Sequence, residues 1–338
     1  MVHSCEVFRS TRWPRNVVAV RKDERVNLPV ICLLGPTASG KSGLAVRVCS
    51  RLGRGGRPAE IVNTDSMVVY RGMDIGTATP TLSEQRAVRH HVVSILDVTE
   101  SSSIVLMQKL AREATEECLS RGVVPVLVGG SALYTKAIVD EMTIPPTDPT
   151  VRAKWQERLE AEGPEALHRE LARRDSKAAE SILPGNGRRI VRALEVIDLT
   201  GSFTATIPDG TSHWPDTVHI GLELPREDMD RRIADRVDQM WENGLVDEVR
   251  ALVDVGLRDG LTASRALGYR QVLEFLDGEY DEEEARRRTV TGTRRFARKQ
   301  LMWYRRDDRI EWFNALDPDL DDKVVARVLT ALSTDEED

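Results

Sequence analysis

One short stretch near the N-terminus constrains the fold of this chain more than any other. The run Val30–Leu34 is apolar, as in a buried strand, and a helical pattern begins at Gly43. Between them lies a Gly-x-x-x-x-Gly-Lys-Ser motif formed by Gly35, Pro36, Thr37, Ala38, Ser39, Gly40, Lys41 and Ser42. Its glycines allow backbone angles at which successive N–H groups face one anion, and the following helix adds its own unpaired N–H groups. The motif predicts a bound di- or triphosphate, with Lys41 on phosphate oxygens and Ser42 as a ligand of Mg²⁺.

Apolar runs alternate with helical patterns in the first part of the chain. Strands are expected at 60–64, 91–97, 123–128 and 217–224, with helices at 102–121 and 132–139. Such alternation is typical of a parallel sheet with helices on both faces. The predicted fold class is α/β, a P-loop NTPase-like parallel sheet with flanking helices and a helical insertion.

The alternation stops at a proline-rich stretch, 145–149. Beyond it, helices are expected within 150–200 and at 225–243, 245–256, 263–276 and 281–304, followed by an edge strand at 309–313. We therefore divide the chain into an N-terminal extension (1–28), the first part of the P-loop core (29–142), a helical insertion (143–216), the completion of the core with basic C-terminal helices (217–325) and an acidic tail (326–338).

Polar side chains follow three of the expected strands. Because ligands of parallel α/β sheets bind beyond the carboxyl ends of the strands, Asp65 is expected beside the phosphate loop, as a Mg²⁺ ligand or general base. Capping a turn is the other role open to it. Asp97 is a candidate for the Mg²⁺-associated acid of ordinary P-loop hydrolases. Ser131 follows two glycines and is expected to face the same crevice, to cap the next helix, or to do both.

Charge is unevenly distributed along this chain of net charge −7. Between 285 and 306 there is no acidic residue, and nine arginines and lysines fall in that window. A second basic cluster occupies 188–192. The two clusters predict a localised site for a polyanion. Arg232 and Arg236 lie four residues apart on one helix face, where they either clamp phosphates or form solvated surface.

Cysteine spacing and hydropathy indicate the compartment. Cys5, Cys32, Cys49 and Cys118 are far apart, which argues against a zinc ribbon or a disulfide framework and fits a reducing cytoplasm. No apolar run approaches the roughly 20 residues of a membrane span, and residues 1–28 lack the apolar core of a signal peptide. A cytoplasmic protein without a membrane partner is expected.

Several motifs together resemble one family, the tRNA dimethylallyltransferases or tRNA isopentenyltransferases, in their bacterial form. Besides the phosphate loop, the resemblance rests on 65–67, 70–78, 127–134, 189–196, 268–271 and 293–306. The phosphate loop is shared with many ATPases, whereas the other motifs are specific. The resemblance covers about residues 30–313.

The resemblance implies transfer of a dimethylallyl group from dimethylallyl diphosphate to the exocyclic amine of the adenosine adjacent to the anticodon in tRNAs. It implies a channel entered by the diphosphate from one side and by a flipped-out base from the other, because a stacked adenine cannot react. The expected partners are the anticodon stem-loop of tRNA and dimethylallyl diphosphate, the cofactor is Mg²⁺, and the enzyme is expected to be a monomer.

A residue-by-residue match to the family assigns roles. Asp65 becomes the base that takes the amine proton and, with Ser42, a ligand of Mg²⁺, while Ser131 lies at the base or the reacting centre. Arg232 or Arg236 helps to hold the diphosphate. The expected tRNA contacts are Asp65, Ser66, Met67, Val68, Ser131, Arg152, Arg188, Arg189, Ile190, Val191, Arg192, Gly268, Tyr269, Arg270, Gln271, Arg294, Arg298, Lys299 and Arg305. The chain departs from the family pattern at Val68, often Gln, and at Thr79, often Lys.

Two other functions remain open at the level of sequence. A P-loop kinase would use Asp97 for Mg²⁺, leave the basic helix as solvated surface and bind ATP far better than an allylic diphosphate. A non-catalytic RNA-binding protein with a nucleotide switch would keep its RNA-dependent function after Asp65→Ala.

Overall fold

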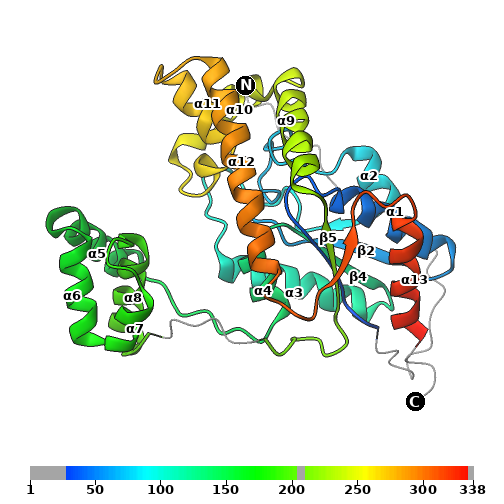
Figure 1. Cartoon of the computed structure of the whole chain (residues 1–338), viewed down its shortest axis with the longest axis horizontal. Helices are drawn as coiled ribbons and strands as arrows, with labels where there is room; N and C mark the ends of the chain where they lie inside the picture. The colour runs from blue at the N-terminus through cyan, green and yellow to red at the C-terminus, as the bar shows by residue number, and fades with distance from the viewer. Residues whose placement is uncertain (1–27, 204–209, 334–338) are drawn as a thin grey trace, which may run out of the picture.

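A single parallel sheet forms the centre of the molecule. The computed structural model describes residues 28–203 and 210–333, and its six strands lie in the order β3-β2-β4-β1-β5-β6 (Figure 1). They are β1 Ile31–Leu34, β2 Ala59–Asn63, β3 His90–His91, β4 Val124–Val128, β5 Val218–Glu223 and β6 Glu311–Asn314. All neighbouring pairs are parallel, which confirms the predicted fold class. The central position of β1 puts the phosphate loop at the middle of the carboxyl edge.

Helices cover both faces of the sheet. Ile31 and Leu33 of β1 face a core shared with α1 and α13, whereas Cys32 and Leu34 face a second core shared with α3, α4, α9 and α10. This alternation is what a strand buried on both faces requires. The helices of this part are α1 Lys41–Arg54, α2 Leu82–Ala87, α3 Ile104–Ser120, α4 Ala132–Val139, α9 Arg226–Glu242, α10 Leu245–Asp254, α11 Tyr269–Leu276, α12 Glu282–Tyr304 and α13 Leu320–Ser333.

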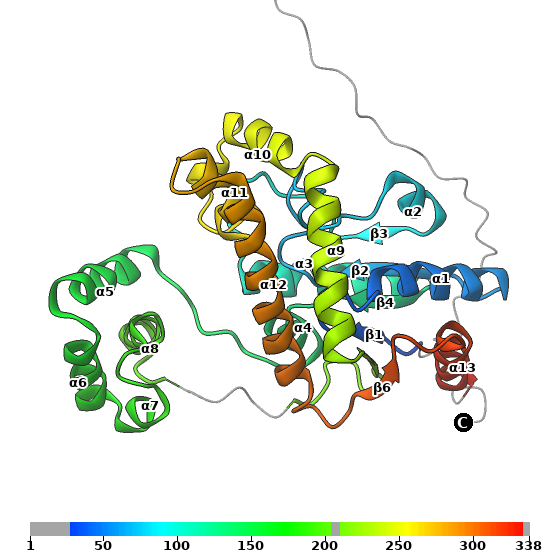
Figure 2. The same ribbon diagram turned by 45° about the horizontal axis from the view of Figure 1, so that its top comes forward.

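Four further helices form a separate group. They are α5 Pro149–Glu162, α6 Pro164–Arg174, α7 Ser176–Ser181 and α8 Gly187–Thr200. Both views show them set to one side of the sheet, beyond α12 (Figures 1 and 2). They have their own core around the fully buried Trp155, whose indole N–H donates to Asp198 at 2.8 Å. Across the described ranges, no helix is both long and apolar enough to cross a membrane.

Some elements differ from the sequence-based expectation. The strand expected at 91–97 stops at His91, because Val92 and Ser94 turn the chain away with φ of +60° and +50°. The helix expected at 263–276 starts as a 3₁₀ turn, η2 Ala263–Arg265, and only α11 is α-helical; a second turn, η1 Leu257–Asp259, precedes it. Helix α13 was not expected. It includes 326–333, which the sequence-based division assigns to the acidic tail. Residues 1–27, 204–209 and 334–338 lie outside the described ranges.

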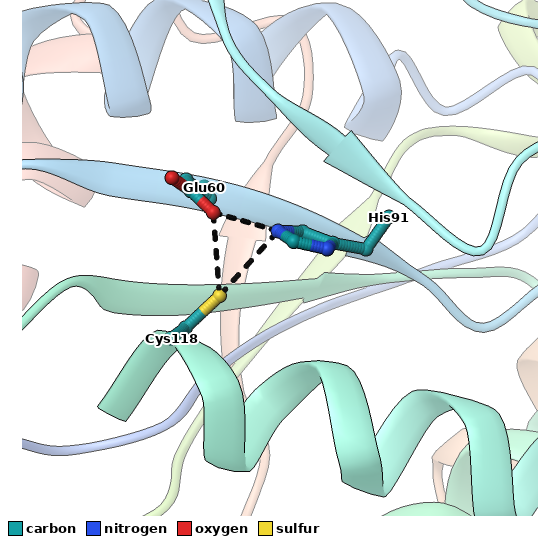
Figure 3. Close-up of side chains that lie close together, drawn as sticks. All are labelled: Glu60, His91 and Cys118. Carbon is teal, nitrogen blue, oxygen red and sulfur yellow. Dashed lines mark hydrogen bonds and ion pairs between the residues drawn. The ribbon is translucent and has the colours of Figure 1, made fainter. Parts of the chain in front are cut away.

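A buried cluster of charged and polar groups joins the short edge strand β3 to its neighbours (Figure 3). Glu60 of β2 lies 2.6 Å from Nε2 of His91, and both are within 3.6 Å of the sulfur of Cys118 on α3. Arg121 donates to both oxygens of Glu60, at 2.9 and 2.6 Å. Burial alone would raise the pKa of Glu60, but His91 and Arg121 hold that pKa well below its usual range. The guanidinium of Arg121 thus neutralises Glu60, so the cluster holds β3 in place without needing a metal ion.

We expect Glu60→Gln to lower the free energy of unfolding by about 2 kcal/mol at pH 7, because Arg121 loses its carboxylate in a mostly buried setting. Urea denaturation of both proteins measures this difference. Since the folded-state pKa of Glu60 is depressed, its contribution is present above the unfolded pKa and is lost as pH falls through the folded pKa. The difference in the free energy of unfolding between wild type and Glu60→Gln should therefore decrease below about pH 4.

Glu117→Gln is the matched control, because Glu117 lies 3.6 Å from the same arginine but is half exposed. It should change the free energy of unfolding by less than about 0.5 kcal/mol. Equal stability of wild type and Glu60→Gln at pH 7 would contradict the assigned role of the cluster.

Candidate active site

The phosphate loop has the conformation that its sequence predicts. Strand β1 ends at Leu34, the loop follows, and α1 begins at Lys41. Gly35 and Gly40 have φ of +149° and +88°, a region that favours glycine, and Ala38 has φ of +65°. A Cβ on Gly35 would lie 2.9 Å from the carbonyl oxygen of Leu222 on β5, so the loop starts tightly packed against the neighbouring strand.

A cleft of about 520 Å³ opens beside this loop. One wall is the end of the loop with Lys41 and Ser42, and another is helix α9 with Arg232 and Arg236. The two arginines therefore face the phosphate loop, as expected for a clamp on phosphates. A narrower pocket of about 90 Å³ shares Lys41, Ser42 and Arg236 with the cleft and is also lined by Asp65 and Val68.

Positive charge inside the cleft is poorly compensated. Burial lowers the pKa of Lys41 to about 8, with a further decrease from Arg236, while Asp65 acts in the opposite direction. Burial also lowers the pKa of Arg236, again opposed by Asp65. The buried Nε of Arg236 has no hydrogen-bond partner among the described residues. Buried cations with so little compensation favour a polyanionic ligand.

Asp65 is held in a turn at the end of β2, which is one of its two predicted roles, while its role as a Mg²⁺ ligand or general base stays a prediction. Its Oδ1 accepts from the backbone N–H of Met67 at 2.9 Å, and its own N–H donates to Oδ1 of Asn63 at 2.9 Å. The side-chain amide of Asn63 also donates to the carbonyl oxygens of Asp65 and Val92. This turn fixes the carboxylate while Oδ2 has no hydrogen bond within the described ranges. Oδ2 is therefore available to accept a proton or ligate a cation.

Ser131 occupies the N-cap position of α4, but its hydroxyl makes no capping hydrogen bond. The capping alternative is therefore not used. Ser131 is half-buried and follows Gly129, which lines the narrow pocket, although Ser131 itself is not among the residues lining it. The contact of Ser131 with the flipped-out adenine stays a prediction.

Asp97 does not take part in this site. Its carboxylate is exposed and lies 2.7 Å from Nη1 of Arg71, and it lines neither the cleft nor the narrow pocket. The shortness of β3 is the reason, since the chain has already left the sheet when Asp97 is reached. The kinase hypothesis loses its Mg²⁺-associated acid here.

Two residues near the site escaped sequence analysis as individual candidates. Gln300 and Tyr304 stand one turn apart on α12 and are buried. Gln300 contacts the phosphate loop and Gly130, and Tyr304 donates to the carbonyl oxygen of Gly129 at 3.3 Å. Helical periodicity could have indicated them, because both residues lie on the same helix face as Ala297, which is buried.

Helix α12 divides its charges between two environments. Arg294 donates to the backbone carbonyl oxygen of Asp230 at 2.9 Å, and Arg298 lies 3.7 Å from its carboxylate. Arg305 lies 3.2 Å from Glu223. The exposed face instead has three cations among large apolar side chains, and we call it the outer face of α12: Arg295, Phe296, Lys299, Met302, Trp303 and Arg306.

The arginines expected to contact tRNA in the insertion fall into two groups. Arg152 and Arg192 converge on the fully buried Glu195, at 2.8 and 2.9 Å, and Arg192 also donates to the carbonyl oxygens of Pro145 and Pro146. These contacts fix the entry into the insertion, although Arg152 remains half exposed.

Arg188 and Arg189 are exposed at the start of α8. Arg189 lines a cavity of about 360 Å³ together with Trp303 and Arg306 of the outer face. The two basic clusters therefore meet at one cavity. Ile190 and Val191 have their side chains in the core of the insertion, so their predicted contact with tRNA would have to use the backbone.

Most of the motif 268–271 lies in the interior, and its contacts with tRNA stay a prediction. Tyr269 is fully buried; its hydroxyl donates to Glu248 at 2.5 Å and accepts from the N–H of Gly76 at 3.2 Å. The other carboxylate oxygen of Glu248 accepts from the N–H groups of 74 and 75, which line the cleft. Gln271 is buried and accepts from the N–H of Gly268, itself buried. Of this motif only Arg270 is exposed.

We expect Tyr269→Phe to lower the free energy of unfolding by about 1–2 kcal/mol, because Glu248 and the N–H of Gly76 lose a buried partner. Affinity for tRNA should stay within twofold at a temperature where the variant is folded. Thermal denaturation and a filter-binding assay measure the two quantities. Arg270→Gln is the matched control for stability, since it leaves this network intact. A large loss of tRNA affinity with unchanged stability would restore Tyr269 as an RNA contact.

Known proteins match most of this chain. Residues 68–307 match the family model described as IPP transferase. A curated tRNA dimethylallyltransferase of Cutibacterium acnes is 82% identical over 319 residues, covering 94% of this chain and 100% of that protein. A tRNA dimethylallyltransferase of Thermobifida fusca is 56% identical over 300 residues, covering 88% and 94%.

Solved structures give the same result for the fold. The tRNA isopentenylpyrophosphate transferase of Bacillus halodurans has a TM-score of 0.67 and 37% identity, covering 91% of this chain and 98% of that chain. A eukaryotic dimethylallyltransferase acting on tRNA has a TM-score of 0.72 at 24% identity, which shows a shared fold.

Proposed function

Since this chain belongs to the IPP transferase family, we propose that it transfers a dimethylallyl group from dimethylallyl diphosphate to tRNA. We further propose that the acceptor is the exocyclic amine of the adenosine adjacent to the anticodon. The observation that carries this proposal is the narrow pocket in which Asp65 lies with Lys41 and Ser42 of the phosphate loop. A carboxylate beside a diphosphate site suits a reaction that moves a proton and releases diphosphate.

The diphosphate binds in the cleft against the loop N–H groups and Lys41, with Arg232 and Arg236 on its other side. The C1–O bond of the allylic diphosphate breaks, and its electron pair leaves with the diphosphate. The amine nitrogen forms the new bond to C1 and gives one proton to Oδ2 of Asp65. The allylic carbon ionises readily, so the protein mainly positions the reactants and stabilises the leaving group.

Oxygen donors in the pocket fit Mg²⁺. Ser42 offers a hydroxyl and Asp65 a carboxylate, and Mg²⁺ commonly takes one or two protein oxygens together with phosphate oxygens and water. When bound, the ion neutralises charge on the diphosphate. This supports the assignment of Ser42 and Asp65 as its ligands.

Two basic surfaces support the anticodon stem-loop as the second substrate. The outer face of α12 and the start of α8 meet at the cavity lined by Arg189, Trp303 and Arg306. Cations next to an aromatic side chain suit phosphates and unstacked bases. The insertion and α12 would hold the stem-loop between them. We propose that the enzyme acts as a monomer. Its proposed compartment is the cytoplasm, where tRNA is found.

The test is incubation of the protein with Mg²⁺, labelled dimethylallyl diphosphate and unmodified tRNA, followed by nucleoside analysis. We expect label in a prenylated adenosine. Label in no nucleoside, with ATP consumed on a small acceptor instead, would contradict the proposal. A tRNA with another base in place of the adenosine adjacent to the anticodon is the matched control and should remain unlabelled.

A further inference from the structure

One buried side chain of α12 connects two loops of the active site. The Oε1 atom of Gln300 accepts from the backbone N–H of Thr37, in the phosphate loop, at 2.9 Å. Its Nε2 atom donates to the carbonyl oxygen of Gly130, in the loop between β4 and α4, at 2.6 Å. Gln300 is 4% exposed, so its amide is a poor candidate for direct contact with tRNA. The side chain spans the gap between the ends of β1 and β4.

The position of Gly130 makes this bridge matter for the chemistry. A Cβ on Gly130 would lie 3.3 Å from Nζ of Lys41, so the two loops are in near contact beside the diphosphate site. Ser131 follows immediately. The pairing of β1 with β4 ends at Leu33 and Val128, and beyond it the side chain of Gln300 bonds to both loops.

The bridge also occupies one backbone N–H group of the phosphate loop. The N–H of Thr37 is bonded to Gln300, so the orientation of this peptide unit is set by α12. One turn further along, Tyr304 holds the carbonyl oxygen of Gly129. The inner face of α12 therefore fixes the two loops, while its outer face has the exposed cations Arg295, Lys299 and Arg306.

We propose that Gln300 is a positioning residue, which holds the phosphate loop and the Gly129–Ser131 loop at the separation needed for the diphosphate and the acceptor amine to meet. This inference rests on the proposed function. It assigns to α12 a second task besides RNA binding, because the same helix sets the shape of the diphosphate site.

Gln300→Met tests the bridge, since it keeps the volume and removes both hydrogen bonds. We expect kcat/KM for dimethylallyl diphosphate to fall about 100-fold, as for a misplacement of about 1 Å. Affinity for inorganic diphosphate should fall at least fivefold, and affinity for tRNA should stay within threefold. Gln300→Asn, which is too short to reach both partners but keeps the polarity, should show the same pattern if Gln300→Met does not fold.

Thr289→Val is the matched control, because Thr289 is a buried polar residue of the same helix whose hydroxyl, among the described residues, bonds only to the backbone of Ala285. It should alter stability without altering kcat or the affinity for diphosphate. If Gln300→Met and Gln300→Asn behave like Thr289→Val, the positioning role is wrong. Failure of the proposed function is distinguishable, because wild type itself would then transfer no label, while the diphosphate-binding measurement would still report on the bridge.

Discussion

Asp65→Asn should lower kcat by about 100- to 10,000-fold while both substrates still bind. The change keeps the size of the side chain and an oxygen that can accept from the N–H of Met67, so the turn at the end of β2 should persist. What is lost is the carboxylate oxygen that, in the proposed reaction, takes the proton from the amine. Because the loss falls on the transition state, kcat and kcat/KM should fall together.

The measurement is steady-state transfer of labelled dimethylallyl to tRNA, together with equilibrium binding of each substrate to the variant. Asp74→Asn is the matched control, since Asp74 is an exposed carboxylate at the rim of the same cleft and should affect kcat less than threefold. Full activity in Asp65→Asn would remove Asp65 from the mechanism. A loss of diphosphate binding alone would make it a ligand of Mg²⁺ rather than a base.

The phosphate loop and Asp65 could be located from the sequence because their signals are local. The loop has two glycines at a fixed spacing between a strand and a helix, and Asp65 directly follows a strand, so the position of each follows from neighbouring residues. The order of the strands and the approach of α9 to the loop follow from long-range packing. The spacing of Arg232 and Arg236 does not separate a phosphate clamp from solvated surface. The prediction that one of them holds the diphosphate comes from the resemblance to a family.

Burial is the property that the motifs 189–196 and 268–271 do not predict. Ile190 and Val191 lie within a basic cluster in the sequence, but helical periodicity turns their side chains inward while Arg188 and Arg189 stay outside. Tyr269 has a polar group that suits RNA binding, yet the nearby Glu248 satisfies it internally. A motif in the sequence does not separate residues that touch a ligand from residues that shape its site.

The same distinction changes which cations of α12 matter most for tRNA. Arg294, Arg298 and Lys299 are among the expected tRNA contacts, but the two arginines lie beside Asp230, which compensates part of their charge. Lys299 is exposed, as are Arg295 and Arg306. Arg294 and Arg298 should therefore contribute less to tRNA binding than the three cations of the outer face.

The triple variant Arg295→Gln, Lys299→Gln, Arg306→Gln should weaken tRNA binding about 100-fold at moderate salt. Each lost phosphate contact should reduce the slope of log affinity against log salt by about 0.7–0.9, so the slope should flatten by roughly 2–3. Binding of inorganic diphosphate should not change, because these side chains line neither the cleft nor the narrow pocket. Titration of tRNA at several salt concentrations measures both quantities.

The variant Arg286→Gln, Arg287→Gln, Arg288→Gln is the matched control, since it removes the same charge from the other end of the same helix. These arginines are paired with Asp238 and Glu284. They lie at the end of α12 that is away from Arg306 and from the cavity lined by Arg189, Trp303 and Arg306. If charge alone attracted tRNA, both variants would flatten the slope equally. If the outer face is the binding surface, only the first variant will do so, because counterions are released where phosphates contact the protein.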